Sequence, residues 1–172
     1  PGGTRIGKKL RSIFDNLSAD EPLSIESELF IVSADRSQHI QQQIRPALEK
    51  NKWVICDRFY DSTLVYQGII GGLDLDLIDK INKISTRLLS PDLTFHLSCN
   101  IETIMKRIKR RNKGIKNQHR FEKYDVNFHT RLQEAYKTIT KRDPERFFDI
   151  NTEYPLDKTV KEAFKIIKMR LQ

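Results

Sequence analysis

The feature that most constrains the fold is a short apolar run that ends abruptly in two charges. Residues 53–56 read Trp-Val-Ile-Cys without polar alternation, which is typical of a strand buried on both faces of a sheet. Asp57 and Arg58 follow directly. Ligands of parallel α/β sheets bind beyond the carboxyl ends of the strands, so this acid and this base are candidate site residues. On spacing alone, a structural ion pair at a strand end explains them as well.

Hydrogen-bonding side chains follow the same run, ahead of a loop that contains Gly68, Gly71 and Gly72. They are Asp61, Ser62, Thr63, Tyr66 and Gln67. So many polar groups beyond one strand end favour a ligand site over an isolated ion pair.

The rest of the chain alternates helical and strand patterns. Apolar residues at helical spacing predict helices over residues 5–17, 25–44, 77–88, 101–108, 128–139 and 160–171. Short apolar runs predict further strands over residues 93–97 and 147–150. This alternation indicates an α/β layered fold with parallel strands. A length of 172 residues suits a single domain, residues 1–172.

Composition narrows the class of protein. The chain is 38% hydrophobic, and no apolar run approaches the roughly 20 residues of a membrane span, which predicts a soluble protein without a membrane partner. Cys56 and Cys99 match no metal or redox spacing, so we interpret both as small core residues in a reducing, cytoplasmic compartment. The net charge of +8 favours anionic partners.

Arg36 falls within the apolar stripe of the predicted helix over residues 25–44. An unpaired buried charge is very costly, so this arginine needs partners. One interpretation is an internal salt bridge to Asp35 or Asp61. The other is a guanidinium presented to a base carbonyl or a phosphate.

Residues 106–123 are strongly basic, with Glu122 as the one acid. Gly114 and the lack of an apolar stripe past Ile108 predict a loop. A solvated basic face and a nucleic-acid patch both explain such a run. A third interpretation is a lid, residues 107–123, that closes over phosphates during transfer. No aromatic residues interleave the basic core, which disfavours single-strand binding.

Several blocks of sequence resemble one enzyme family. Residues 56–68, Cys-Asp-Arg-Phe-Tyr-Asp-Ser-Thr-Leu-Val-Tyr-Gln-Gly, resemble the DRY segment of bacterial thymidylate kinases, with Phe59 in the tyrosine position. The other matching blocks are Pro1-Gly-Gly-Thr-Arg, Ser33-Ala-Asp-Arg-Ser-Gln-His, Ser90-Pro-Asp-Leu-Thr-Phe, His119-Arg-Phe-Glu and Phe148-Asp-Ile-Asn. They occur in family order and span essentially the whole chain, so order and spacing together make the resemblance specific.

The resemblance implies a three-layer fold like that of P-loop NTPases, as found in nucleoside monophosphate kinases. It implies transfer of the γ-phosphoryl of MgATP to dTMP, giving dTDP and ADP for dTTP biosynthesis, by a homodimer that does not bind nucleic acid. The sequence has no Gly-x-x-x-x-Gly-Lys-Ser/Thr, and its first methionine is Met105. We therefore expect about 40 residues upstream of Pro1, with the first strands and the donor-phosphate lysine.

The resemblance also assigns roles to residues. Arg58 would clamp the acceptor phosphate, and Asp57 would order Mg²⁺-bound water and Arg58. Arg36 and Gln67, with Thr63 nearby, would read the base edge, and Tyr66 would lie beside the sugar. The remaining assignments are Gly2, Gly3 and Thr4 on the acceptor-phosphate side, and Arg120 as a catalytic lid residue with Arg107 and Arg111 as further lid cations.

The chain departs from the family pattern at two further positions. Val32 replaces a phenylalanine that stacks on the base, and Phe30 lies on roughly the opposite side of the helix. His119 replaces the aspartate that precedes the lid arginine. Val32 keeps a related kinase with another small acceptor as an alternative. The rival class for so basic a chain is a nucleic-acid-binding fragment without catalysis.

Overall fold

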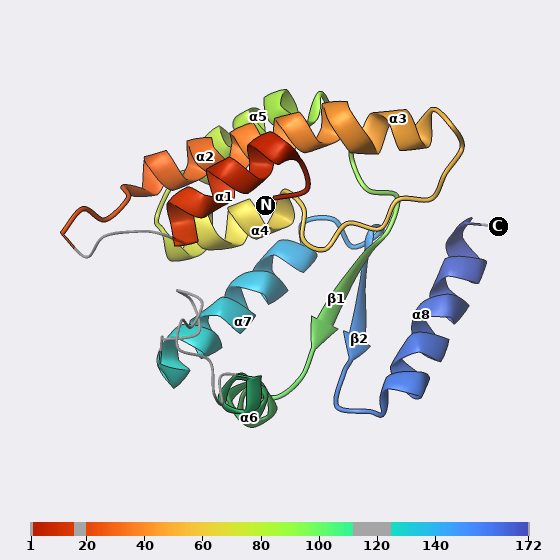
Figure 1. The fold of residues 1–172 in the computed structure, drawn as a ribbon. Coiled ribbons are helices and arrows are strands. Elements are labelled where there is room, and N and C mark those ends of the chain that lie inside the picture. The colour runs from red at the N-terminus through yellow and green to blue at the C-terminus, as the bar shows by residue number, and fades with distance from the viewer. Residues whose placement is uncertain (1, 16–19, 112–124, 172) are drawn as a thin grey trace. The chain divides into compact units, whose positions relative to one another are not determined.

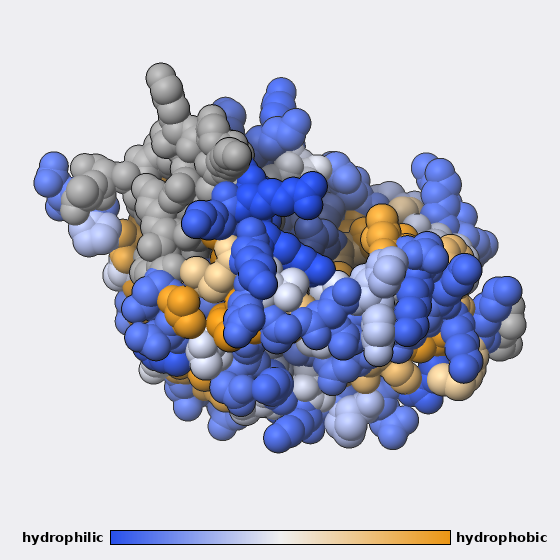
Figure 2. Space-filling model, turned by 90° about the horizontal axis from the view of Figure 1, so that it is seen from below, coloured by the Kyte–Doolittle hydropathy of each residue, from blue (hydrophilic) through white to orange (hydrophobic). Residues whose placement is uncertain are grey.

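The computed structural model describes residues 2–15, 20–111 and 125–171 (Figure 1). The chain forms two compact units, Pro1–Ser90 and Pro91–Gln172. Hydrophilic side chains dominate the molecular face drawn in Figure 2, as expected for a chain in which 31% of residues are charged.

The first unit is helical in its described part, and its long central element is α2. The elements in chain order are α1 (Arg5–Asp15), α2 (Ile25–His39), η1 (Ile40–Ile44), α3 (Arg45–Leu48), α4 (Asp61–Thr63), η2 (Leu64–Ile70) and α5 (Leu75–Thr86). Two of them, η1 and η2, are π-helical, a geometry that is frequent at functional sites. Helix α2 contacts α1, α5 and η2, and α1 lies alongside it in Figure 1.

Local signals in the sequence explain where two of these helices begin. Ser24 is the N-cap of α2, where its Oγ accepts the backbone N–H of Ser27 at 3.1 Å. Asp74 is the N-cap of α5 and accepts the N–H of Leu77 at 2.7 Å. Each side chain satisfies a backbone donor that has no partner within its helix.

The buried face of α5 is more polar than its sequence suggests. Ile78, Asn82 and Ser85 are buried, and they share one face because they are four and three residues apart. Leu77 and Ile84, which belong to the apolar stripe, are 47% and 77% exposed. The apolar stripe therefore predicted that a helix forms here, but not which face is buried. The buried face carries Asn82 and Ser85.

The predicted strand over residues 53–56 is wrong. These residues form no regular secondary structure, and Trp53 and Ile55 are 71% and 97% exposed. An apolar run becomes a buried strand only where neighbouring strands satisfy its backbone. In the part of the chain that the structure describes, no strand pairs with it. Cys56 is accordingly exposed rather than a core residue.

The second unit contains a parallel pair of strands. Its elements are β1 (Thr94–Ser98), α6 (Ile101–Arg111), α7 (Val126–Thr140), β2 (Phe147–Asn151) and α8 (Leu156–Leu171). The two strands pair in parallel from Thr94↔Phe147 to Ser98↔Asn151, as Figure 1 shows. Both predicted strands are therefore confirmed, each ending one residue later than predicted. The described part of the stretch between them includes α6 and α7, and a parallel pair needs a long connection of this kind.

A buried arginine joins the two strands at their amino ends. Arg146 is 8% exposed; it donates to Asp143 Oδ2 at 2.9 Å and to Thr94 Oγ1 at 2.7 Å. Its guanidinium also lies 4.3 Å from the ring centroid of Phe147. One side chain thus connects the start of β1 to the residues around the start of β2.

The basic segment begins as a helix rather than a loop. Residues 107–111, the first part of the predicted lid, belong to α6. Residues 112–123 lie outside the described residues, and so does Arg120. Among the described helices, none is both long and apolar enough to cross a membrane.

Candidate functional site

Arg36, on α2, is a buried cationic group in the first unit. Its Nη1 donates to Asn82 Oδ1 at 2.9 Å and more weakly to Ser85 Oγ at 3.4 Å, both on α5. Its Nη2 donates to Thr63 Oγ1 on α4. These three acceptors are neutral side chains, while Asp35 and Asp61 lie close enough to favour the charged form of Arg36.

Burial lowers the pKa of Arg36 but leaves its charge in place at neutral pH. Arg36 is 8% exposed. Loss of solvation lowers the pKa of its guanidinium to about 10, although the nearby carboxylates of Asp35 and Asp61 act to raise it. The guanidinium remains protonated at neutral pH. A buried guanidinium that stays charged can donate to an acceptor atom of a ligand through any N–H group that is not already bonded.

Asn82 and Ser85 are site residues that the sequence analysis missed. They appeared in the sequence only as polar positions within a helix that was located by its apolar stripe. The available signal was their spacing from Ile78, which places all three on one face. Asn82 Nδ2 and Ser33 Oγ are buried without a hydrogen-bond partner within the described residues, so both can bond a further polar group.

Gln67 is the second predicted base-reading residue, and its side chain is hydrogen-bonded to Glu28. Gln67 lies in η2 and is 5% exposed; Glu28 lies in α2 and is 4% exposed. Gln67 Nε2 donates to Glu28 Oε2 at 3.2 Å. Thr63 precedes Gln67 by about one helical turn and contacts Arg36 directly. The structure therefore brings Arg36 and Thr63 into contact, and it joins Gln67 to the same helix, α2, through Glu28.

The exposed Arg58 lies beside the half-buried Tyr66. Arg58 Nη1 lies 3.4 Å from Tyr66 Oη, and the guanidinium carbon is 5.6 Å from the tyrosine ring centroid. Arg58 has a left-handed backbone with φ of 63°. Such a conformation is strained for a residue other than glycine, and strain of this kind clusters at functional sites. The backbone thus directs an exposed arginine to the residue next to Gln67.

Asp57 is exposed and stands beside Arg58 in the chain. Within the described residues, no group of three or more His, Cys, Asp or Glu side chains could hold a metal ion. A single exposed carboxylate fits Mg²⁺, because that ion keeps several waters and is usually completed by substrate phosphates.

The Gly-Gly-Thr turn before α1 is anchored to α2 and η1. Gly2, with φ of 99°, donates its N–H to Asp35 Oδ1 at 3.1 Å. The carbonyl of Gly3 accepts from Gln43 Nε2 at 2.5 Å, and Thr4 Oγ1 accepts the N–H of Gly7 at 2.9 Å. The turn is therefore fixed by hydrogen bonds.

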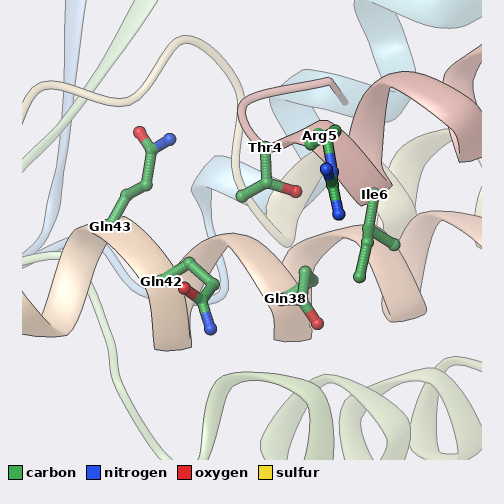
Figure 3. A pocket seen from close by; sticks show the side chains of 6 residues that line it. All are labelled: Thr4, Arg5, Ile6, Gln38, Gln42 and Gln43. Atoms are coloured by element: carbon green, nitrogen blue, oxygen red, sulfur yellow. The ribbon is translucent and has the colours of Figure 1, made fainter.

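A cavity of about 400 Å³ adjoins this turn (Figure 3). Its lining residues come from the start of α1 and from α2 and η1: Thr4, Arg5, Ile6, Gln38, Gln42 and Gln43. Thr4 is the predicted site residue among them. The cavity therefore lies apart from the side chains that surround Arg36.

Of the two departures from the family pattern, Val32 can be described, whereas His119 lies outside the described residues. Val32 is half-buried on α2 and Phe30 is 61% exposed. Phe30 therefore does not take the place of a buried stacking ring.

The predicted lid cations that can be described lie on α6, in the second unit. Arg107 donates to the carbonyl oxygen of Thr152 at 2.5 Å and to its Oγ1 at 3.0 Å. Arg111 is the last residue of the helix. In this conformation Arg107 binds the residue after β2.

The parallel α/β fold is that of a P-loop NTPase-like, nucleotide-binding phosphotransferase of the nucleoside monophosphate kinase class. The family model for thymidylate kinase matches residues 1–163. The chain belongs to the thymidylate kinase family.

Individual relatives agree with this assignment. The chain is 40% identical over 174 residues to the thymidylate kinase of Maridesulfovibrio salexigens, covering 99% of this chain and 78% of that protein. It is 33% identical over 172 residues to the thymidylate kinase of Nostoc sp., covering all of this chain and 80% of that protein. The crystal structure of thymidylate kinase from Ehrlichia chaffeensis superposes with a TM-score of 0.73 at 28% identity, covering 98% of this chain and 76% of that one.

Proposed function

We propose that this protein transfers the γ-phosphoryl group of ATP to dTMP, giving dTDP and ADP, and that the base is read in the polar region around Arg36. The observation that carries the proposal is the buried guanidinium of Arg36, held by Thr63, Asn82 and Ser85. Carbonyl oxygens of a pyrimidine are suitable acceptors for its remaining N–H groups. Gln67, in the same region, supplies a second polar contact for the base edge.

Arg58 is the proposed clamp for the acceptor phosphate. A guanidinium can hold two phosphate oxygens at once, and this one is exposed, with Tyr66 beside it. Tyr66 would then lie beside the sugar. Gly2, Gly3 and Thr4 would contribute backbone and hydroxyl groups on the acceptor-phosphate side, because glycine permits close backbone approach to a ligand.

Mg²⁺ belongs to the proposal as an ion bound mainly by phosphates and water. When bound, it neutralises charge that develops on the transferring phosphoryl group. Asp57 would hold one of its waters and orient Arg58. Positioning and charge neutralisation carry most of the rate enhancement in phosphoryl transfer, so the protein needs no covalent intermediate.

The basic residues Arg107, Arg111 and Arg120 are proposed to act as cations toward the donor phosphates. The support is the family resemblance of His119-Arg-Phe-Glu and the basic last turn of α6. Arg107 would have to exchange its bonds to Thr152 for bonds to phosphate. We further propose that the protein is a cytoplasmic homodimer, with exposed apolar residues such as Phe30 and Ile84 as candidates for the interface.

The test is an acceptor panel with the full-length protein. ADP formation from MgATP is measured with dTMP, dUMP and dGMP, with duplex DNA added in a parallel set. We expect turnover with dTMP and weaker turnover with the other acceptors. A preferred acceptor other than dTMP contradicts the substrate assignment, and strong, salt-sensitive DNA binding without turnover contradicts the whole proposal.

A further inference from the structure

We propose that Glu28 is a positioning residue that fixes the amide orientation of Gln67 and thereby selects a base that carries a ring N–H donor over one that does not. The inference rests on the proposed function, because it needs Gln67 to face the base. Glu28 itself does not need to touch the nucleotide.

The contact between the two residues is buried and joins separate elements. Glu28 comes from α2 and Gln67 from η2, 39 positions later, and each is at most 5% exposed. The backbone of Gln67 is also fixed, since its carbonyl accepts the N–H of Leu73 at 3.1 Å. Its neighbour Gly68 is closely packed, because a Cβ added there would clash with Leu75 Cδ2. The backbone that carries Gln67 is therefore held in place, and its side chain is joined to α2 through Glu28.

The chemistry of the pair determines which end of the amide is turned to Glu28. A carboxylate has acceptor atoms only, whereas a glutamine amide has a donor end and an acceptor end. Glu28 therefore selects the orientation in which Gln67 Nε2 points toward α2, as the 3.2 Å contact shows. The amide oxygen of Gln67 is then the group left to face a ligand.

The amide oxygen of Gln67, turned toward the base, would distinguish thymine from cytosine. Thymine carries an N–H at ring position 3, which can donate to the amide oxygen, whereas cytosine presents an unprotonated nitrogen that would oppose it. Arg36 acts in the same direction, because it is a pure donor and suits the two carbonyl oxygens of thymine. A buried polar group left unpaired is strongly disfavoured. Glu28 would thus set part of the preference for dTMP over dCMP without contacting either.

The test compares E28Q with E26Q. Both changes are Glu→Gln on the same helix, but Glu26 is exposed in the first turn and Glu28 is buried. Dissociation constants of dTMP and dCMP are measured by calorimetry on the full-length protein. The amide introduced by E28Q can offer either of its ends, so it no longer fixes Gln67. We expect the preference for dTMP to fall by about fivefold in E28Q, the worth of one hydrogen bond, and to stay unchanged in E26Q.

A second variant separates orientation from packing. The swap E28Q/Q67E keeps one carboxylate and one amide in the pair, and the carboxylate that Q67E introduces would present an acceptor oxygen to the base. We expect the swap to recover the preference for dTMP that E28Q loses. The inference is overturned if E28Q weakens dTMP and dCMP equally, or if the swap is as unselective as E28Q. An unmodified protein that binds dTMP but does not phosphorylate it would instead contradict the proposed function.

Discussion

Gly7 of α1 lies directly against the carboxylate of Asp35 on α2, so closely that a Cβ added to Gly7 would overlap Asp35 Oδ1. The same oxygen accepts the N–H of Gly2 at 3.1 Å. One carboxylate therefore holds the turn before α1, while the absence of a side chain on Gly7 allows α1 to approach α2.

Replacing Gly7 with alanine is expected to destabilise the first unit. Alanine favours a helix over glycine by about 1 kcal/mol, but the new methyl group would displace Asp35 from its bond to Gly2. Overpacking of this kind costs about 1–3 kcal/mol, so we expect a net loss of stability in chemical denaturation. The double variant G7A/D35A is the control, because removing the carboxylate removes the clash. If G7A destabilises equally with and without Asp35, the contact is not the cause.

Asn82→Ala is expected to lower the free energy of unfolding more than Ser85→Ala does. It removes the 2.9 Å acceptor of the buried guanidinium of Arg36, which should cost about 1–3 kcal/mol in unfolding free energy. Ser85→Ala removes only the 3.4 Å contact and should cost less. Denaturant titration measures both, and equal effects of the two substitutions would show that Asn82 is not the main partner.

Most of the secondary structure could be predicted because the signals are local. Ser24 and Asp74 cap their helices as such residues do anywhere, and the two strand patterns over residues 93–97 and 147–150 match β1 and β2. The pattern over residues 53–56 failed for the opposite reason. A strand buried on both faces is stabilised by its neighbours, and its own four residues carry no information about whether neighbours are present.

Arg146→Lys tests the connection between the two strands. Lysine keeps the charge but cannot form the planar fork that joins Asp143 to Thr94. It also loses contact area over the ring of Phe147. We expect a loss of about 2 kcal/mol, from a buried group left partly unbonded. The matched control is Arg142→Lys, which follows α7. Equal stabilities of the two variants would contradict the anchoring role of Arg146.

The candidate site was only partly accessible from sequence. Arg36 stood out because a charge in an apolar stripe needs partners, but its partners Asn82 and Ser85 are 46 and 49 positions away. Glu28 was likewise visible only as an acid in the first turn of a helix, where acids are common. Its contact with Gln67 depends on the packing of η2 against α2, and no local pattern encodes that.

The central claim is that Arg58 grips the acceptor phosphate, and Arg58→Ala tests it most directly. The side chain is exposed, so folding should be nearly unaffected, and Arg131→Ala, at an exposed position of α7, is the control. Steady-state kinetics of the full-length protein with MgATP and dTMP gives the result. The account predicts that kcat/KM falls about 100-fold in R58A, equivalent to about 3 kcal/mol of transition-state stabilisation, and stays unchanged in R131A. A kcat/KM for R58A close to that of the unmodified protein would contradict it.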